Sequence, residues 1–237
     1  MKILLINDDG YQAEGLKILY EKLQKIGEVT VVAPFHGMSA KSVSLTITDA
    51  LTVDRIADNV YAVHGTPADC AMFALFGLNQ KYDLVVSGCN DGLNLSYDVL
   101  FSGTIGGALT ASIHKIKTVA FSSPHHNFTP LIDHFEEVWE FINKYDLLSE
   151  DYVLNVNFPK NIPPKGIKIG RLYCRSDNHY FIKNGDTYLA QRDFEDSKNL
   201  PPDADTRQIL DGYISIVPIS RLPFDPRFYE QIAKKVK

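Results

Sequence analysis

The fold is decided by the stretch Met1-Lys2-Ile3-Leu4-Leu5-Ile6-Asn7-Asp8-Asp9-Gly10, in which an apolar run leads directly into two carboxylates and a glycine. A dense run of Ile and Leu that ends in turn residues predicts a strand buried on both faces of a parallel sheet. Open α/β sheets bind ligands at the carboxyl ends of such strands, so we expect Asp8 and Asp9 at the mouth of a crevice. Two neighbouring anions repel unless a cation lies between them, and oxygen ligands favour Mg²⁺, Mn²⁺ or Ca²⁺. The alternative is that Asp8 caps the following helix while Asp9 is solvated.

Helical and strand patterns alternate after Gly10, which predicts an α/β fold with a doubly wound, mostly parallel sheet. The expected helices cover the apolar positions from Leu16 to Ile26, then Pro67–Phe76 with Thr66 as its cap, Ile105–His114 and Thr129–Asn143. The expected strands are Val29–Ala33, Asp83–Ser87, Thr118–Ser122 and Val153–Phe158, with a hairpin region formed by Val43–Thr48, Leu51–Arg55 and Val60–Val63.

The C-terminal part has a different sequence pattern. Strand-like runs at Ile167–Tyr173 and Tyr213–Pro218 are separated by polar, Pro-rich connections rather than by helices. The segment Arg175–Leu200 has little core signal and predicts a protruding hairpin or loop suited to a subunit contact. We therefore expect one domain over residues 1–237, with a core at about 1–170, a hairpin arm at about 171–200, and a C-terminal strand and helix at about 201–237.

Composition excludes several classes of protein. The 237 residues are 45% hydrophobic with a net charge of −5, which gives no electrostatic reason to bind polymeric nucleic acid. The apolar stretch Ile3–Ile6 is too short for a signal peptide, and no segment approaches membrane-spanning length. Cys70, Cys89 and Cys174 show no CxxC spacing, which suits reduced thiols. We expect a cytoplasmic enzyme that contacts neither polymeric nucleic acid nor a membrane.

Two further loops offer oxygen ligands near the carboxylate pair. Ser39 follows the second strand, whose end lies beside that of the first strand in a right-handed βαβ unit. Asn90 follows the strand Asp83–Ser87 and offers a neutral carbonyl oxygen. The alternatives are that Ser39 is only a turn residue, and that Asn90 and Asn94 adopt left-handed turns without a ligand.

Small and hydroxylated residues at Ser102–Ala108 immediately precede a predicted helix. Free backbone N–H groups at a helix N-terminus favour a phosphate, although neither a Walker loop nor GxGxxG is present. His64, His125 and His126 lie near the crevice loops but form no HExxH motif, so they receive no role.

These segments together resemble the SurE (survival protein E) family of metal-dependent nucleotidases, and the likeness covers most of the chain. The residues that carry it are Ile6–Gly10, Ser39 with Ser44-Leu45-Thr46, Gly65–Cys70, Val86–Asn90, Asn94-Leu95, Ser102-Gly103-Thr104, Leu154–Asn157 and Gly212–Pro218. The chain departs from the family's usual residues at Phe35, Met38, Cys89, Asp91 and Ser96.

The resemblance implies a Rossmann-like three-layer core, a protruding β-hairpin arm and a C-terminal oligomerisation segment that builds homodimers or homotetramers. It implies one divalent metal cation per subunit, Mg²⁺ or Mn²⁺, held by Asp8, Asp9, Ser39 and Asn90. It also implies a substrate phosphate surrounded by Asn94, Ser102, Gly103 and Thr104.

The activity that we expect is hydrolysis of nucleoside monophosphates by a phosphoric monoester hydrolase of the 5′-nucleotidase type, with 3′-nucleotidase activity left open. Asp8 and Asp9 are the expected catalytic residues, with Asp8 as the base. One rival is a phosphatase with an aspartyl-phosphate intermediate, although Gly10 stands where its second Asp belongs. Another is a non-catalytic module that binds a nucleotide or phosphate for regulation, or an interaction protein that acts through the Arg175–Leu200 arm.

Overall fold

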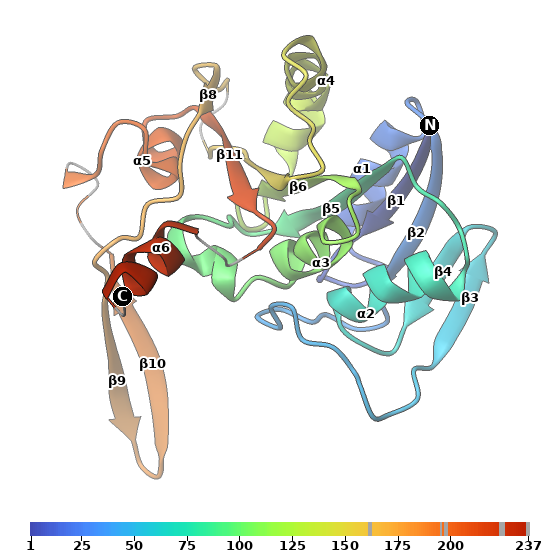
Figure 1. Ribbon diagram of the computed structural model, residues 1–237, viewed down its shortest axis with the longest axis horizontal. Helices are drawn as coiled ribbons and strands as arrows, with labels where there is room; N and C mark the ends of the chain where they lie inside the picture. Colours follow the sequence, from blue (N-terminus) through green and yellow to red (C-terminus); the bar gives the residue numbers. More distant parts are fainter. Residues whose placement is uncertain (161–162, 195, 197–198, 223–225, 236–237) are drawn as a thin grey trace.

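The computed structural model describes residues 1–160, 163–194, 196, 199–222 and 226–235 (Figure 1). The strands of the main sheet are β1 (Lys2–Ile6), β2 (Glu28–Pro34), β3 (Val53–Ala57), β4 (Val60–Val63), β5 (Leu84–Asp91), β6 (Lys117–Ser123), β7 (Tyr152–Asn157), β8 (Ile167–Ile169) and β11 (Ile214–Ser220). The helices are α1 (Glu14–Leu23), α2 (Pro67–Met72), α3 (Gly103–Ser112), α4 (Thr129–Lys144), α5 (Asp205–Leu210) and α6 (Pro226–Lys235). A π-helical turn at Phe73–Gly77 continues α2, and a 3₁₀ turn at Ser96–Leu100 precedes α3.

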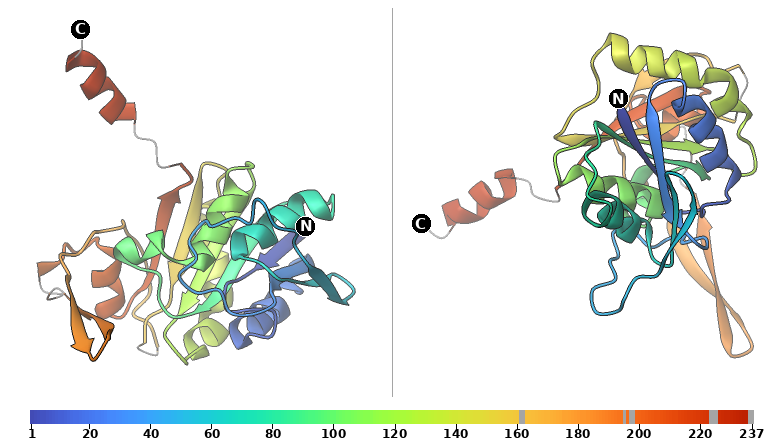
Figure 2. Two further views of the ribbon diagram at one scale, coloured as in Figure 1. Left: turned by 90° about the horizontal axis from the view of Figure 1, so that it is seen from below. Right: turned by 90° about the vertical axis from the view of Figure 1, so that its right-hand side faces the viewer.

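The central strand β1 divides the core into two halves because its side chains alternate across the sheet. Ile3 and Leu5 are fully buried in one cluster, with apolar residues of α1 and α4. Leu4 and Ile6 are buried in a second cluster, with residues of α2 and α3. Figure 2 shows these two pairs of helices on opposite sides of the sheet, so the expected three-layer α/β core is confirmed.

The sheet has the order β3-β4-β2-β1-β5-β6-β7-β11-β8. Strands β4, β2, β1, β5, β6 and β7 run parallel, whereas β3 and β11 pair antiparallel with β4 and β7. The connection from β1 leads to β2 on one side, and β5 lies on its other side. The carboxyl ends of β1 and β5 therefore meet where the strand order reverses, which is where open α/β sheets bind ligands.

The predicted strand at Val43–Thr48 is wrong, because this segment is irregular. Its polar groups bond to the start of α2 instead of to a neighbouring strand. Ser44 O accepts from the Thr66 hydroxyl at 2.5 Å, and Thr46 N donates to the Asp69 carboxylate at 2.8 Å.

The prediction that no helix separates the C-terminal strands is also wrong, since α5 lies between the hairpin and β11. This helix is only six residues long, too short for an apolar period to show in the sequence.

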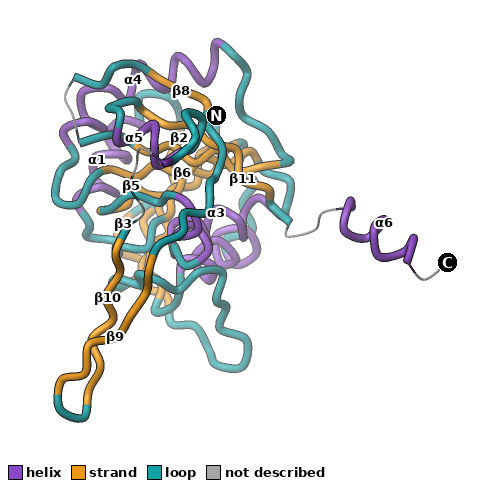
Figure 3. Tube along the Cα trace, turned by 90° about the vertical axis from the view of Figure 1, so that its left-hand side faces the viewer, coloured by secondary structure: helices purple, strands orange, loops and turns teal. Residues whose placement is uncertain are grey.

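The remaining predicted helices and strands are present, although β5 extends to Asp91 rather than ending at Ser87, and β8 ends at Ile169 rather than at Tyr173. Strands β9 (Asn178–Asn184) and β10 (Thr187–Asp193) form an antiparallel hairpin that protrudes from the body, as Figure 1 shows. Helix α6 stands away from the sheet in Figure 3. The predicted C-terminal helix falls on it, while Asp225, Val236 and Lys237 lie outside the described residues. Among the described helices, none has the length and apolar character needed to cross a bilayer.

Candidate active site

A tight turn at the end of β1 sets the direction of the two carboxylates. The Asn7 side chain donates to Gly10 O at 2.9 Å and accepts from Gly10 N at 3.3 Å, which closes the turn around Asp8 and Asp9. Asp8 is 3% exposed and Asp9 is half-buried. Helix α1 begins only at Glu14, and no side chain caps it. The alternative that Asp8 caps this helix is therefore wrong.

The loop after β2 is tied to the same turn. Met38 N donates to Asp8 O at 2.7 Å, which brings the next residue, Ser39, to the pocket above β1. Farther along the loop, Ser42 N donates to Phe101 O at 3.1 Å. The loop is thus held by backbone bonds at both ends of the segment that carries Ser39.

Glycines let α3 approach these loops closely. A Cβ atom on Gly103 would lie 2.7 Å from Asp8 Cβ, and one on Gly106 would lie 1.8 Å from Ser42 O. Any larger residue at these positions would push the helix away, because real Cβ contacts are longer. The small residues that the sequence shows before and within α3 are therefore needed to place its N-terminus against Asp8.

The Thr104 hydroxyl connects Asp8 to Asn90. It donates to Asp8 Oδ1 in a short hydrogen bond and lies 3.1 Å from Asn90 Oδ1. The Asn90 amide donates to Gly92 O at 2.7 Å, so its carbonyl oxygen faces the side of Asp8. Two oxygens from the ends of β1 and β5 thus converge on one point.

Burial makes the carboxylate pair electrostatically unusual. The pKa of Asp8 is raised to about 6, first by desolvation and also by the charge of Asp9, against the opposing effect of the Thr104 hydrogen bond. Burial also raises the pKa of Asp9, although its Oδ2 accepts from Asp91 N at 3.0 Å. Two adjacent carboxylates that resist ionisation indicate a site short of positive charge.

The structure brings Asp8, Asp9, Ser39 and Asn90 together around a pocket of about 250 Å³. Two carboxylates, one amide oxygen and one hydroxyl are the hard donors that Mg²⁺ and Mn²⁺ prefer, so this set fits a divalent cation. The roles of these four residues remain predictions.

The four residues expected around a phosphate divide into two pairs. Asn94 and Ser102 line the pocket, and Ser102 also caps α3 by accepting from Ile105 N at 3.2 Å. Gly103 and Thr104 are buried in the first turn of α3, where backbone N–H groups have no partner within the helix. The positive end of α3 therefore faces the pocket, as an anion site requires.

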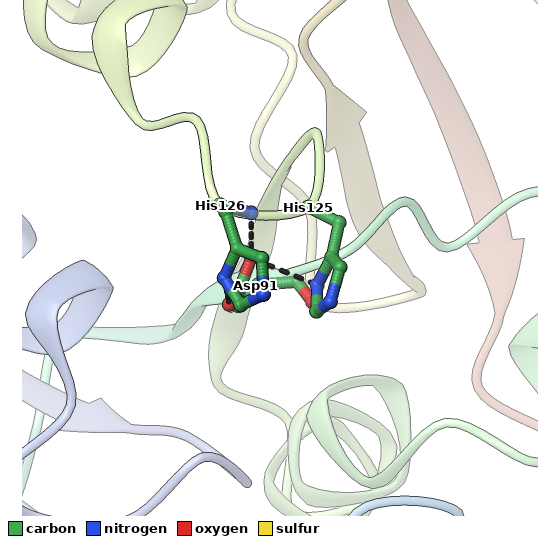
Figure 4. Close-up of side chains that lie close together, drawn as sticks. All are labelled: Asp91, His125 and His126. Carbon is green, nitrogen blue, oxygen red and sulfur yellow. Dashed lines mark hydrogen bonds and ion pairs between the residues drawn. The ribbon is translucent and has the colours of Figure 1, made fainter.

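Sequence reasoning gave no role to His125 and His126, yet both side chains lie against Asp91 at the rim of this pocket (Figure 4). One signal was available. The two histidines follow β6, whose carboxyl end lies beside that of β5, so they belong to the same edge of the sheet.

A second pocket of about 510 Å³ lies next to the first, and the two share Asp98. Its wall includes Arg175, Arg192 and the exposed ring of Phe194. The guanidinium groups lie 5.1 Å and 4.5 Å from the centre of that ring. A flat aromatic group has room beside the smaller, oxygen-lined pocket.

The chain is similar to known proteins in both sequence and fold. A sequence model of the family described as "Survival protein SurE" matches residues 3–180. A protein of Mannheimia succiniciproducens named 5′-nucleotidase SurE is 39% identical over 229 residues, which cover 92% of both chains. One of the same name from Polaromonas naphthalenivorans is 34% identical over 94% of this chain and 95% of its own. The crystal structure of the SurE protein from Aquifex aeolicus superposes with a TM-score of 0.85 at 32% identity, over 100% of both chains.

Proposed function

The chain belongs to the survival protein SurE family, and we propose that its oxygen-lined pocket hydrolyses nucleoside monophosphates to nucleoside and phosphate. The observation that supports this most is the convergence of buried Asp8 with Asp9, Ser39 and Asn90 beside the N-terminus of α3. We propose a phosphoric monoester hydrolase of the 5′-nucleotidase type that depends on one Mg²⁺ or Mn²⁺ per subunit.

Asp8, Asp9, Ser39 and Asn90 would hold the cation. A divalent cation in such a site polarises the phosphoryl oxygens and lowers the pKa of a water. Asp8 would accept the proton of the attacking water, because its carboxylate lines the pocket next to the position of the cation that would hold this water. Asp9 completes the carboxylate pair that makes the site anionic without its cation.

The chain itself holds the phosphate. Ser102, Gly103 and the backbone of Thr104 would present the first turn of α3 to the equatorial oxygens, and Asn94 also lines the pocket. The Thr104 hydroxyl fixes Asp8, because it donates to that carboxylate.

The test is release of inorganic phosphate from a panel of nucleoside 5′- and 3′-monophosphates with Mg²⁺ or Mn²⁺. We expect turnover that depends on the added metal and stops with a chelator. Tight nucleotide binding without phosphate release would instead support the regulatory module.

We place the nucleoside of the substrate in the second pocket, because it adjoins the phosphate site through Asp98 and carries an aromatic face. Replacing Phe194 by alanine should raise KM for nucleoside monophosphates and leave turnover of p-nitrophenyl phosphate unchanged. Phe181→Ala is the matched control, since this ring is exposed on the hairpin and lines neither pocket. An equal loss with both substrates would refute this placement.

We also propose a homodimer or homotetramer built through the C-terminal segment, and a cytoplasmic location that suits its three unpaired cysteines. Helix α6 exposes Tyr229 and Ile232, while the body has an apolar pocket of about 720 Å³ whose wall includes Leu109 and Leu222. Light scattering should show oligomers for the full chain and monomers for a chain that ends at Ser220.

A further inference from the structure

A group of three metal-binding side chains lies outside the oxygen-lined pocket at its rim. Asp91 ends β5, and His125 and His126 lie in the loop between β6 and α4. Figure 4 shows both imidazole rings projecting from their loop in the same direction, with one ring on each side of the Asp91 carboxylate. One ligand atom from each residue lies within 4.8 Å of the other two.

The distances suit coordination of one ion. His125 Nδ1 lies 3.2 Å from Asp91 Oδ1, and His126 Nδ1 lies 3.1 Å from Asp91 Oδ2. Ligand atoms bound at about 2.0–2.2 Å in a tetrahedral or octahedral shell are about 2.8–3.6 Å apart. Both measured separations fall in this interval.

The backbone holds the three side chains in place before any ion binds. His126 adopts φ +56°, a left-handed conformation that is uncommon for residues other than glycine, and its N–H donates to Asp91 Oδ1 at 2.6 Å. Adjacent residues in an extended chain point in opposite directions, whereas these two rings lie side by side, with centres 3.7 Å apart and planes tilted by 32°. The side chains of Asp91, His125 and His126 are therefore presented together on one surface.

The donor set differs from that of the first pocket. Two imidazole nitrogens with one carboxylate oxygen favour transition metals of the Zn²⁺ and Co²⁺ class, whereas the all-oxygen set around Asp8 favours Mg²⁺. Both histidines are largely exposed, at 69% and 78% of their side-chain surface, so the remaining coordination positions are open to water or an anion.

We propose that Asp91, His125 and His126 form a second divalent-metal site, selective for Zn²⁺-like ions, at the rim of the oxygen-lined pocket. Asp91 N donates to Asp9 Oδ2, so a single hydrogen bond connects this site to the first carboxylate pair. A cation there adds a positive centre on the Asp9 side of the pocket, where an anionic group of a ligand can reach it.

The alternative is that each ring carries its proton on Nδ1 and donates it to Asp91 without any metal. Metal titration of the full-length protein separates the two. In saturating Mg²⁺, wild-type protein should bind one further equivalent of Zn²⁺ by calorimetry, and Co²⁺ should give a visible absorption band typical of nitrogen ligands. A double variant with His125→Ala and His126→Ala should lose both signals.

Two other variants make the result specific. His64→Ala removes a surface histidine that lies 2.9 Å from Asp54 and that has no third ligand among the described residues, and it should keep the additional equivalent. Asp8→Asn disables the first pocket and should also keep it. The proposal is overturned if wild-type protein binds no Zn²⁺ beyond Mg²⁺, if the double variant binds as wild type does, or if Asp8→Asn abolishes the signal.

Discussion

Two regions of the molecule bury a carboxylate in opposite ways. At the start of α2, Asp69 is 1% exposed and accepts hydrogen bonds from Thr46 N, the Thr46 hydroxyl and Thr66 N, at 2.8, 2.8 and 2.9 Å. At the end of β1, Asp8 is 3% exposed and accepts from the hydroxyl and the backbone of Thr104, yet burial and the neighbouring charge of Asp9 still raise its pKa. The first carboxylate is satisfied by the fold itself. The second is left for a cation to complete, and this contrast distinguishes a structural carboxylate from a functional one.

The largest effect that we expect from breaking this contrast is catalytic. Asp8→Asn keeps the size of the side chain but removes both the base and one charge of the cation site. We expect kcat for nucleoside monophosphates to fall by about 10²–10⁴-fold, the usual contribution of a general base. Asp58→Ala is the control, because this carboxylate is exposed and its partner is Arg55 on the β3–β4 hairpin. Wild-type turnover by Asp8→Asn would refute the assignment.

Added Mg²⁺ should stabilise the folded protein through the site around Asp8 and not through the region around Asp69. Because the cation binds the folded protein, Mg²⁺ at a thousandfold excess over its Kd should raise the free energy of unfolding by about 4 kcal/mol. Urea unfolding with and without Mg²⁺ measures this increment. Asp8→Asn should lose most of it, whereas a variant at Asp69 should retain it, and an equal increment in both variants would remove the distinction between the two carboxylates.

The sequence was enough to predict the group of residues around Asp8, but not the hydrogen bonds that satisfy Asp69. The carboxyl ends of parallel strands lie at one edge, so the order of motifs was enough to group Asp8, Asp9 and Asn90. The bonds from Thr46 to Asp69 and the left-handed turn at His126 depend on loop conformations that no periodicity encodes. For that reason Val43–Thr48 was predicted as a strand, and Asp91, His125 and His126 were not grouped.

Removing the satisfied carboxylate should cost stability and leave the chemistry unchanged. Asp69→Ala leaves the half-buried N–H and hydroxyl groups of Thr46 without their acceptor and removes half of the capping box with Thr66. We expect the free energy of unfolding to fall by about 2–4 kcal/mol in urea titrations. At temperatures where the variant stays folded, its kcat should equal that of the wild type, and a loss of kcat in folded protein would place Asp69 in the active site.

The smallest effect is the pH dependence of the metal-free protein, and its sign follows from Asp8. The pKa of Asp8 is about 6 in the folded protein and 3.8 as the ordinary value, so the folded state binds the proton more tightly than the unfolded state does. Stability is therefore lost as pH rises through the interval between these two values, by at most about 3 kcal/mol. Urea unfolding in chelator from pH 4 to pH 7 should show this fall in wild-type protein and a flatter profile in Asp8→Asn. Excess Mg²⁺ should reverse the trend, because it binds the ionised carboxylates. A wild-type profile that rises with pH in chelator would show that the Asp8 carboxylate is already compensated by the fold, as that of Asp69 is.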